Sequence, residues 1–67
     1  MELQNSLKLH RKNNLLTQQD LANAVEVSRQ TIIAIEKGKY VPSVKLALLI
    51  ARELNRKVEE VFTLSPQ

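Results

Sequence analysis

Three residues that favour helix N-termini divide the chain into short helical segments. Thr17, Ser28 and Ser43 each precede a stretch in which apolar residues recur three or four positions apart, the spacing of an α-helix with one buried face. Gly38 suits the left-handed backbone conformation that follows a helix end. These capped, one-sided segments predict an all-α fold of short packed helices.

We expect five helices, over about residues 5–13, 17–24, 28–37, 43–54 and 58–61. Asn5 is the expected cap of the first helix, and Asn55 is expected in the left-handed position after the fourth. The residues expected to face the core are Leu7, His10, Leu21, Ala22, Val25, Ile32, Ile35, Val44, Ala47, Ile50, Ala51, Leu54, Val58, Val61 and Phe62. Residues 63 and 64 are β-prone and are expected to pair with residues 2 and 3. The whole chain, residues 1–67, is predicted to form one domain, with Pro66 and Gln67 fraying.

The size and composition of the chain exclude most catalytic and metal-binding functions. With 67 residues, one histidine and no cysteine, it lacks the groups of a nucleophilic triad and the ligands of a zinc site. Glu59 and Glu60 are adjacent, so on a helix they point about 100° apart and do not flank one bond. A single glycine provides no phosphate-binding loop. We expect no enzyme activity, no catalytic residue, no metal site and no cofactor.

Two further features concern the location of the chain and its partners. No apolar run approaches the roughly 18 residues of a membrane span, and residues 1–5 lack the basic and apolar regions of a signal peptide. The absence of cysteine fits a reducing compartment, so a cytoplasmic protein without membrane insertion is expected. The formal charge of +3 and the isoelectric point of about 9.6 allow an anionic partner such as nucleic acid.

Residues 17–37 have the spacing of a helix-turn-helix motif, in which a tight turn joins two short helices. If Gln18 is counted as the first of about twenty positions, small or apolar residues occupy the places where the helices cross and where the turn is covered. These residues are Ala22, Val25, Val27, Ile32 and Ile35. The second helix of such a motif enters the major groove of DNA, so this segment is predicted to bind double-stranded DNA.

The chain resembles the Cro/lambda-repressor-type (XRE) helix-turn-helix family in three segments, 17–22, 27–32 and 35–43. The similarity covers about residues 7–62 and is closest to the minimal, cytolysin-repressor-like members. It implies a five-helix Cro/lambda-repressor-like domain with a short C-terminal strand, dimerisation, operator binding and transcriptional repression. The chain departs from the family pattern at Glu26, where glycine is common, and at Arg56 and Lys57, where an apolar and a capping residue are usual.

The N-terminal end of the second motif helix supplies the candidate base-reading residues. Arg29 can pair with guanine O6 and N7, and Gln30 with adenine N6 and N7, each pairing discriminating by about 1–3 kcal/mol. Ser28 and Thr31 lie beside them. Ile33 is predicted to face outward, where contact with a thymine methyl group would explain an exposed isoleucine. The alternative is that these residues form an ordinary solvated surface.

The resemblance also assigns residues that would position the motif on DNA. By this resemblance, four residues are expected to contact the DNA backbone: Gln18, Lys39, Tyr40 and Ser43. Such contacts set the register and not the sequence that is read, and Ser43 is first a helix cap. An ion pair between Arg11 and Glu36 is implied as the link from the first helix to the recognition helix.

The C-terminal segment, residues 58–65, is predicted to form a homodimer interface through Val58, Val61, Phe62 and Leu64, because it is more apolar than a core of this size requires. A dimer reads two half-sites about 34 Å apart, so a palindromic operator is expected. Control by a signal would then need a separate regulatory protein. A second hypothesis is a protein-interaction module, such as the antidote of a toxin pair, in which DNA binding is secondary.

Overall fold

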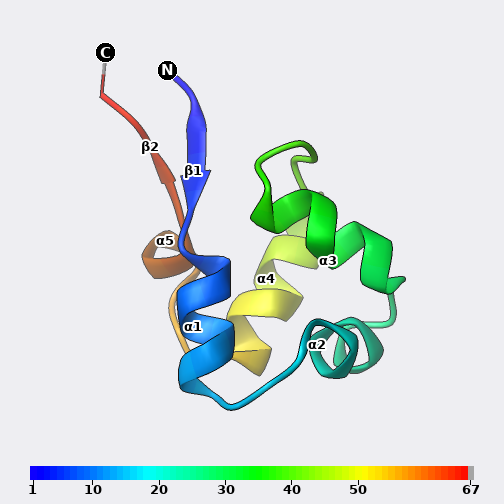
Figure 1. The fold of residues 1–67 in the computed structure, drawn as a ribbon. Coiled ribbons are helices and arrows are strands. Elements are labelled where there is room, and N and C mark those ends of the chain that lie inside the picture. Colours follow the sequence, from blue (N-terminus) through cyan, green and yellow to red (C-terminus); the bar gives the residue numbers. More distant parts are fainter. Residues whose placement is uncertain (67) are drawn as a thin grey trace.

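The structure, a computed structural model, describes residues 1–66 as five helices and one pair of strands (Figure 1). Their order is β1 (Leu3–Asn5), α1 (Leu7–Asn13), α2 (Gln18–Ala24), α3 (Arg29–Glu36), α4 (Val44–Glu53), α5 (Val58–Val61) and β2 (Phe62–Leu64). The predicted five-helix fold with a terminal strand pair is therefore confirmed. The fraying expected at Gln67 lies outside the described residues.

Side-chain caps begin the three central helices at the predicted positions. The hydroxyl of Ser28 accepts a hydrogen bond from the Thr31 amide, and that of Ser43 accepts one from the Leu46 amide. At α2 the Thr17 hydroxyl accepts from the Asp20 amide, while the Asp20 carboxylate accepts from the Thr17 amide at 2.9 Å. Hydrogen bonds from the Thr17 backbone and side chain hold the pKa of Asp20 below its usual value of 3.8, because they stabilise the carboxylate.

The hydrophobic core takes residues from all five helices. Its largest fully buried side chains are Leu7, Leu21, Ile32, Ile35, Ile50, Leu54 and Val61. The prediction that Val44 faces the core is wrong, because its side chain is 77% exposed and Leu46 is buried instead. Leu46, Ile50 and Leu54 recur every four residues along one face of α4, and Val44 lies about 200° around the helix from Leu46.

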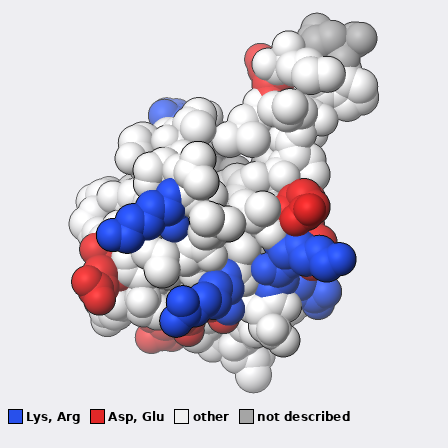
Figure 2. Space-filling model, turned by 180° about the vertical axis from the view of Figure 1, so that it is seen from behind, with Lys and Arg blue, Asp and Glu red and all other residues white. Residues whose placement is uncertain are grey.

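The terminal strands form an antiparallel pair that projects from the helical body (Figures 1 and 2). Leu3 lies opposite Leu64, and Asn5 lies opposite Phe62. The prediction that Asn5 begins the first helix is therefore wrong: Asn5 ends β1, and Ser6 precedes α1. The Asn5 side chain nevertheless accepts a hydrogen bond from the Leu7 amide at 3.1 Å, so it satisfies one N–H group at the start of α1.

Left-handed backbone conformations occur where the helices end. Gly38 has a φ of +73°, and Asn55 a φ of +56°, as expected from the sequence. Glu26, in the turn between α2 and α3, has a φ of +62°, and Leu15, after α1, has a φ of +58°. These two side chains pay a steric cost that glycine avoids. Among residues 1–66, no helix combines the length and apolar character that crossing a bilayer requires.

Candidate nucleic-acid interface

The packing of α2 against α3 builds the predicted helix-turn-helix. Ala22, Ile32 and Ile35 are completely buried where the two helices meet, and Val25 is 5% exposed. The Val27 amide donates to the Ala22 carbonyl at 3.0 Å, which closes the turn. The small and apolar residues chosen from their spacing are therefore the residues that hold the two helices together.

The N-terminal end of α3 is exposed and carries the candidate base-reading residues. Ser28, Arg29 and Gln30 are exposed, and Thr31 is half-buried. In the part of the chain that the structure describes, no hydrogen bond engages the side chains of Arg29 or Gln30, so their donors and acceptors are available to a ligand. Ile33 is half-buried, so it is less exposed than the sequence predicts.

A buried ion pair holds the C-terminal end of α3 against α1. The Arg11 Nε atom lies 2.7 Å from Glu36 Oε2, and the two side chains are only 8% and 5% exposed. Arg11 also donates to the Leu16 carbonyl at 2.8 Å, and the side-chain Nε2 of Gln18 donates to Glu36 Oε1 at 3.2 Å. Since Glu36 is the only acidic residue of α3, its pairing with Arg11 leaves Arg29 as the only uncompensated charge on this helix.

The loop after α3 places the other candidate backbone contacts beside the helix. Lys39 and Tyr40 are exposed, Tyr40 by 47%. The Lys39 amide donates to the Ala34 carbonyl at 2.9 Å, which fixes the loop to the end of α3. Ser43 is exposed but uses its oxygen to cap α4. Gln18 is half-buried and bonded to Glu36, so it braces α3 as well as lying at the start of α2.

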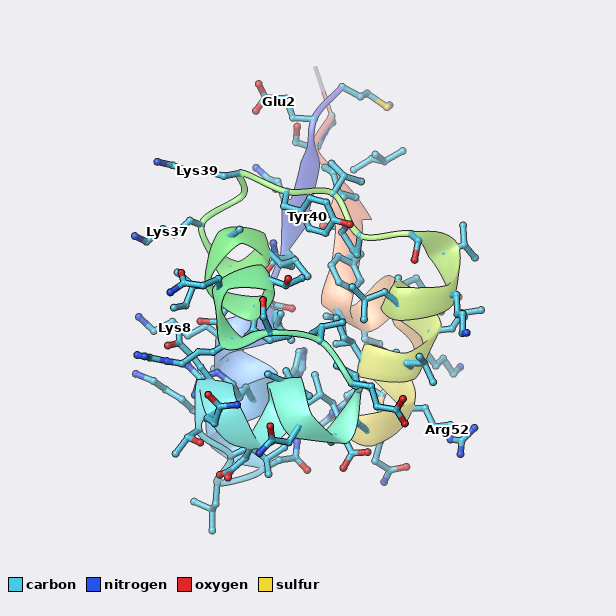
Figure 3. All side chains as sticks on the ribbon, turned by 90° about the vertical axis from the view of Figure 1, so that its right-hand side faces the viewer. Glu2, Lys8, Lys37, Lys39, Tyr40 and Arg52 are labelled. Carbon is cyan, nitrogen blue, oxygen red and sulfur yellow. The ribbon has the colours of Figure 1, made fainter. Side chains whose placement is uncertain are left out.

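Two basic residues that sequence reasoning did not assign to DNA binding lie on the same side of the molecule. Figure 3 shows Lys8 of α1 and Lys37 at the end of α3 projecting toward the same side as Lys39, whereas Arg52 of α4 points the opposite way. Lys37 could have been identified as a candidate from the sequence, because it lies two positions from Lys39. Lys8 could not, because its place on this side depends on how α1 packs beside α3.

The predicted dimer segment is only partly available to a partner. Val61 is completely buried in the core, so the prediction that it lies in an interface is wrong: its side chain closes the core of one chain. Val58 and Phe62 are half-buried, while Leu64 is 61% exposed. Leu3, directly opposite Leu64 on β1, is 37% exposed, so the projecting pair has an exposed apolar patch formed by Leu3 and Leu64.

An open cleft lies between the turn of the motif, the Tyr40–Ser43 segment and α4, with a volume of about 530 Å³. Its lining includes one acidic residue, Glu26, and one basic residue, Lys45, but no histidine. Within residues 1–66, no group of three or more His, Asp or Glu side chains is arranged to hold a metal ion.

Comparisons with known proteins agree on one architecture. A family model described as helix-turn-helix matches residues 7–61. The chain is 57% identical over 60 residues to an uncharacterized HTH-type transcriptional regulator of Methanocaldococcus jannaschii, covering 90% of this chain and 91% of that protein. It is 43% identical over 65 residues to the uncharacterized HTH-type transcriptional regulator YgzD of Bacillus subtilis, covering 97% and 98% of the two chains.

One solved structure extends the comparison to three dimensions. The crystal structure of the clp gene regulator ClgR from Corynebacterium glutamicum superposes with a TM-score of 0.77 at 26% sequence identity. The match covers 81% of this chain but only 57% of the ClgR chain. The likeness therefore concerns the helical domain, and the remainder of ClgR has no counterpart in the match.

Proposed function

Because the chain belongs to the Cro/C1-type (XRE) helix-turn-helix family of DNA-binding transcriptional regulators, we propose that it reads a specific operator sequence with the N-terminal end of α3. The observation that carries this proposal is the contrast between the two ends of α3. The C-terminal end is buried and held by Arg11, while Arg29 and Gln30 at the other end are exposed. The family is not enzymatic, so binding itself is the activity to be explained.

The exposed end of α3 has the chemistry for reading base edges. The guanidinium of Arg29 offers paired donors for guanine, and the amide of Gln30 offers one donor and one acceptor for adenine. Ser28 and Thr31 supply hydroxyl groups next to them, 3.1 Å apart. The exposed part of Ile33 offers an apolar surface for a thymine methyl group. These five residues are the proposed sequence-reading set.

A second set of residues positions the motif on the DNA backbone. The proposed phosphate contacts are Gln18, Lys39, Tyr40 and Ser43. We add Lys8 and Lys37 to this proposed set because they project toward the same side as Lys39 (Figure 3). Contacts of this kind fix orientation and carry the salt dependence of binding. The side chains of Lys8, Lys37 and Lys39 are long enough to adjust to the path of the backbone.

We further propose that the chain binds as a homodimer on a palindromic operator. Two copies related by a two-fold axis would present two copies of α3 about 34 Å apart, the repeat of the major groove. The proposed interface lies in residues 58–65 and uses Val58, Phe62 and Leu64, with Leu3 added and Val61 removed on the grounds of burial. An exposed apolar patch of this kind is stabilised by self-association.

The biological role that fits best is repression by occupying the operator, in the manner of the minimal, cytolysin-repressor-like members that the chain resembles. Residues 1–67 would then act as one DNA-binding domain in the cytoplasm. A signal that relieves repression would act through a separate regulatory protein. This proposal extends the resemblance from the family to one of its branches.

Selection of bound sites from a pool of random duplexes tests the proposed reading of DNA. The wild-type protein is expected to recover a palindrome whose half-sites are about 10 base pairs apart. Arg29→Ala should relax the preference at one guanine per half-site and weaken binding there by about 1–3 kcal/mol. Lys39→Gln is the matched control: it should weaken binding to all sequences alike and reduce the slope of log K against log salt by about one.

Two outcomes would contradict the proposal. If Arg29→Ala weakens all sequences equally, Arg29 does not read a base. If binding to random duplex DNA stays below detection even at low salt, where nonspecific electrostatic binding is strongest, the alternative of a protein-interaction module is favoured.

A further inference from the structure

Asn5 is the residue at which three parts of the fold meet. Its backbone ends β1 opposite Phe62. Its side-chain oxygen accepts a hydrogen bond from the Leu7 amide at 3.1 Å, and its side-chain nitrogen donates to the Ile35 carbonyl of α3 at 2.9 Å. Ile35 is 30 positions away in the sequence, so this single side chain joins the strand pair, the start of α1 and the end of α3.

Within residues 1–66, the hydrogen bond from Asn5 to the Ile35 carbonyl is the only one that joins the strand pair to α3. The Ile35 carbonyl also accepts from the Gly38 amide at 2.9 Å, so Asn5 uses the second acceptor position of this oxygen. Glu36, the next residue, is held by Arg11. The C-terminal end of α3 is thus held through its backbone by Asn5 and through the Glu36 side chain by Arg11 and Gln18.

The position of this contact gives it influence over the DNA-facing end of α3. Arg29 and Ile35 are separated by about 9 Å along the helix axis, at 1.5 Å per residue. A tilt of about 10° around the fixed end would move Arg29 by roughly 1.5 Å. Binding groups need to be held within about 0.5 Å and 10–20° of their working geometry. A tilt of this size at the Ile35 end would therefore be large enough to misplace the base contacts.

We propose that Asn5 is a positioning residue for DNA recognition: by holding the Ile35 carbonyl, it sets the orientation of α3 relative to the terminal strand pair. This inference rests on the proposed function of α3 and adds a residue that itself touches no DNA. It also connects the two proposed surfaces of the molecule, since the strand pair that carries Leu3 and Leu64 is joined through Asn5 to the helix that reads DNA.

The isosteric substitution Asn5→Asp separates the two hydrogen bonds of this side chain. Aspartate keeps an oxygen that accepts from the Leu7 amide, but it replaces the amide donor by a second oxygen. This oxygen would face the Ile35 carbonyl and the negative end of the α3 dipole. Gln4→Glu is the matched control, because it adds the same charge at the neighbouring, exposed position of β1 and leaves the contact with α3 intact.

The readout is the ratio of two affinities, measured at one salt concentration with folded protein. One ligand is the duplex that the wild-type protein selects from the random pool, and the other is a random duplex. Asn5→Asp is expected to bind the selected duplex about tenfold more weakly than Gln4→Glu does, the size of one lost base contact. Binding to the random duplex should agree between the two variants within about twofold, because the phosphate contacts are unchanged.

A residue with a purely structural role would lower the melting temperature and leave this ratio unchanged in the folded protein, and that result would overturn the proposal. If Asn5→Asp does not fold, Asn5→Ser decides the question. Serine is neutral and forms the same local turn with Leu7 more weakly, but its side chain is too short to reach Ile35. If the wild-type protein selects no site at all, the proposed function fails. If the wild-type protein selects a site, and Asn5→Asp and Asn5→Ser keep the wild-type ratio of the two affinities, only the role of Asn5 fails.

Discussion

Two residues with bulky side chains lie in the left-handed backbone region, where glycine would be more stable. Leu15 and Glu26 have φ values of +58° and +62°, and Leu15 is 91% exposed. A side chain in this conformation costs about 1–2 kcal/mol relative to the ordinary helical region. The cost at Glu26 follows from its departure from the glycine that is common there. The strain at Leu15 was not predicted, because nothing in the local sequence marks the end of α1 as left-handed.

Replacement of Leu15 by glycine should stabilise the protein. Leu15→Gly removes the steric cost and loses little buried apolar surface, because Leu15 is 91% exposed. The greater flexibility of glycine in the unfolded chain offsets part of this stabilisation. We expect a net increase of about 0.5–1 kcal/mol in the free energy of unfolding, measured by urea denaturation. Asn55→Gly is the control, because asparagine tolerates a φ of +56° and should gain little. A Leu15→Gly protein less stable than the wild type would contradict this account.

At the scale of helices, short length makes the caps decisive. The helices α2 and α5 have seven and four residues, well below the roughly 12–15 at which an isolated helix becomes stable in water. Caps and packing must therefore hold them. At α5 the Glu60 carboxylate accepts from the Lys57 amide at 2.8 Å, which explains how Lys57 can precede a helix in place of the usual serine or threonine.

The capping box of α2 predicts a dependence of stability on pH. Since the hydrogen bonds from Thr17 lower the pKa of Asp20 in the folded protein, the carboxylate stabilises the fold above its usual pKa of 3.8, which it keeps in the unfolded chain. That contribution is lost as the pH falls through the lowered folded value. Asp20→Asn should thus be less stable than the wild type at pH 6 to 7, and the difference should shrink below about pH 4.

Urea midpoints of wild type and Asp20→Asn between pH 7 and 2.5 measure this effect. Glu59→Gln serves as the control, because it removes a carboxylate that makes no hydrogen bond within residues 1–66. A gap between Asp20→Asn and wild type that stays constant across this range would show that the carboxylate charge is not what stabilises the start of α2.

How far the sequence predicts this fold differs from element to element. Helices with a cap, such as those after Thr17, Ser28 and Ser43, were located within a residue or two because the cap is a local signal. Asn5 was misassigned because its strand partner, Phe62, is distant in the sequence. Periodicity alone did not separate Val44 from Leu46, since apolar residues occur on more than one side of α4 and only tertiary packing decides which of them is buried.

In the candidate site, too, features set by the local sequence could be predicted, and features set by distant contacts could not. The exposure of Arg29 and Gln30 follows from the spacing of the apolar residues that bury the opposite face of α3. From the sequence, Val61 is expected both in the core and in the dimer interface. Which of the two holds, like the position of Lys8, depends on how α1 and α5 pack in three dimensions. The bridge from Asn5 to Ile35 has no sequence signal at all, since it joins a strand end to a helix end across the fold.

At the scale of the whole molecule, charge is distributed unevenly. Figure 2 shows basic and acidic side chains lying side by side on the back of the molecule, whereas Lys8, Lys37 and Lys39 project together on another side (Figure 3). With a formal charge of only +3, this grouping matters more than the total. A local excess of cations raises the rate of encounter with a polyanion and weakens with salt.

The exposed patch of Leu3 and Leu64 predicts self-association through the strand pair. Leu64→Asp places a charge on this patch without disturbing the core, because Leu64 is 61% exposed. Sedimentation should show a dimer for the wild type and a monomer for Leu64→Asp. Leu15→Asp is the matched control, since Leu15 is also exposed but lies at the far end of α1. A Leu64→Asp protein that keeps the dimer mass would rule out this interface.

The pairing of the two chain ends in the strand pair also bears on where local unfolding of the native state begins. Leu3 pairs with Leu64, so the two partners lie 61 positions apart in the sequence, whereas each helix is built from residues that are close in the sequence. Closing so long a loop costs about 3–4 kcal/mol in chain entropy, and contacts of this kind form late in folding. We therefore expect the two ends of the chain to separate transiently while the five helices remain assembled, so that native-state opening begins there.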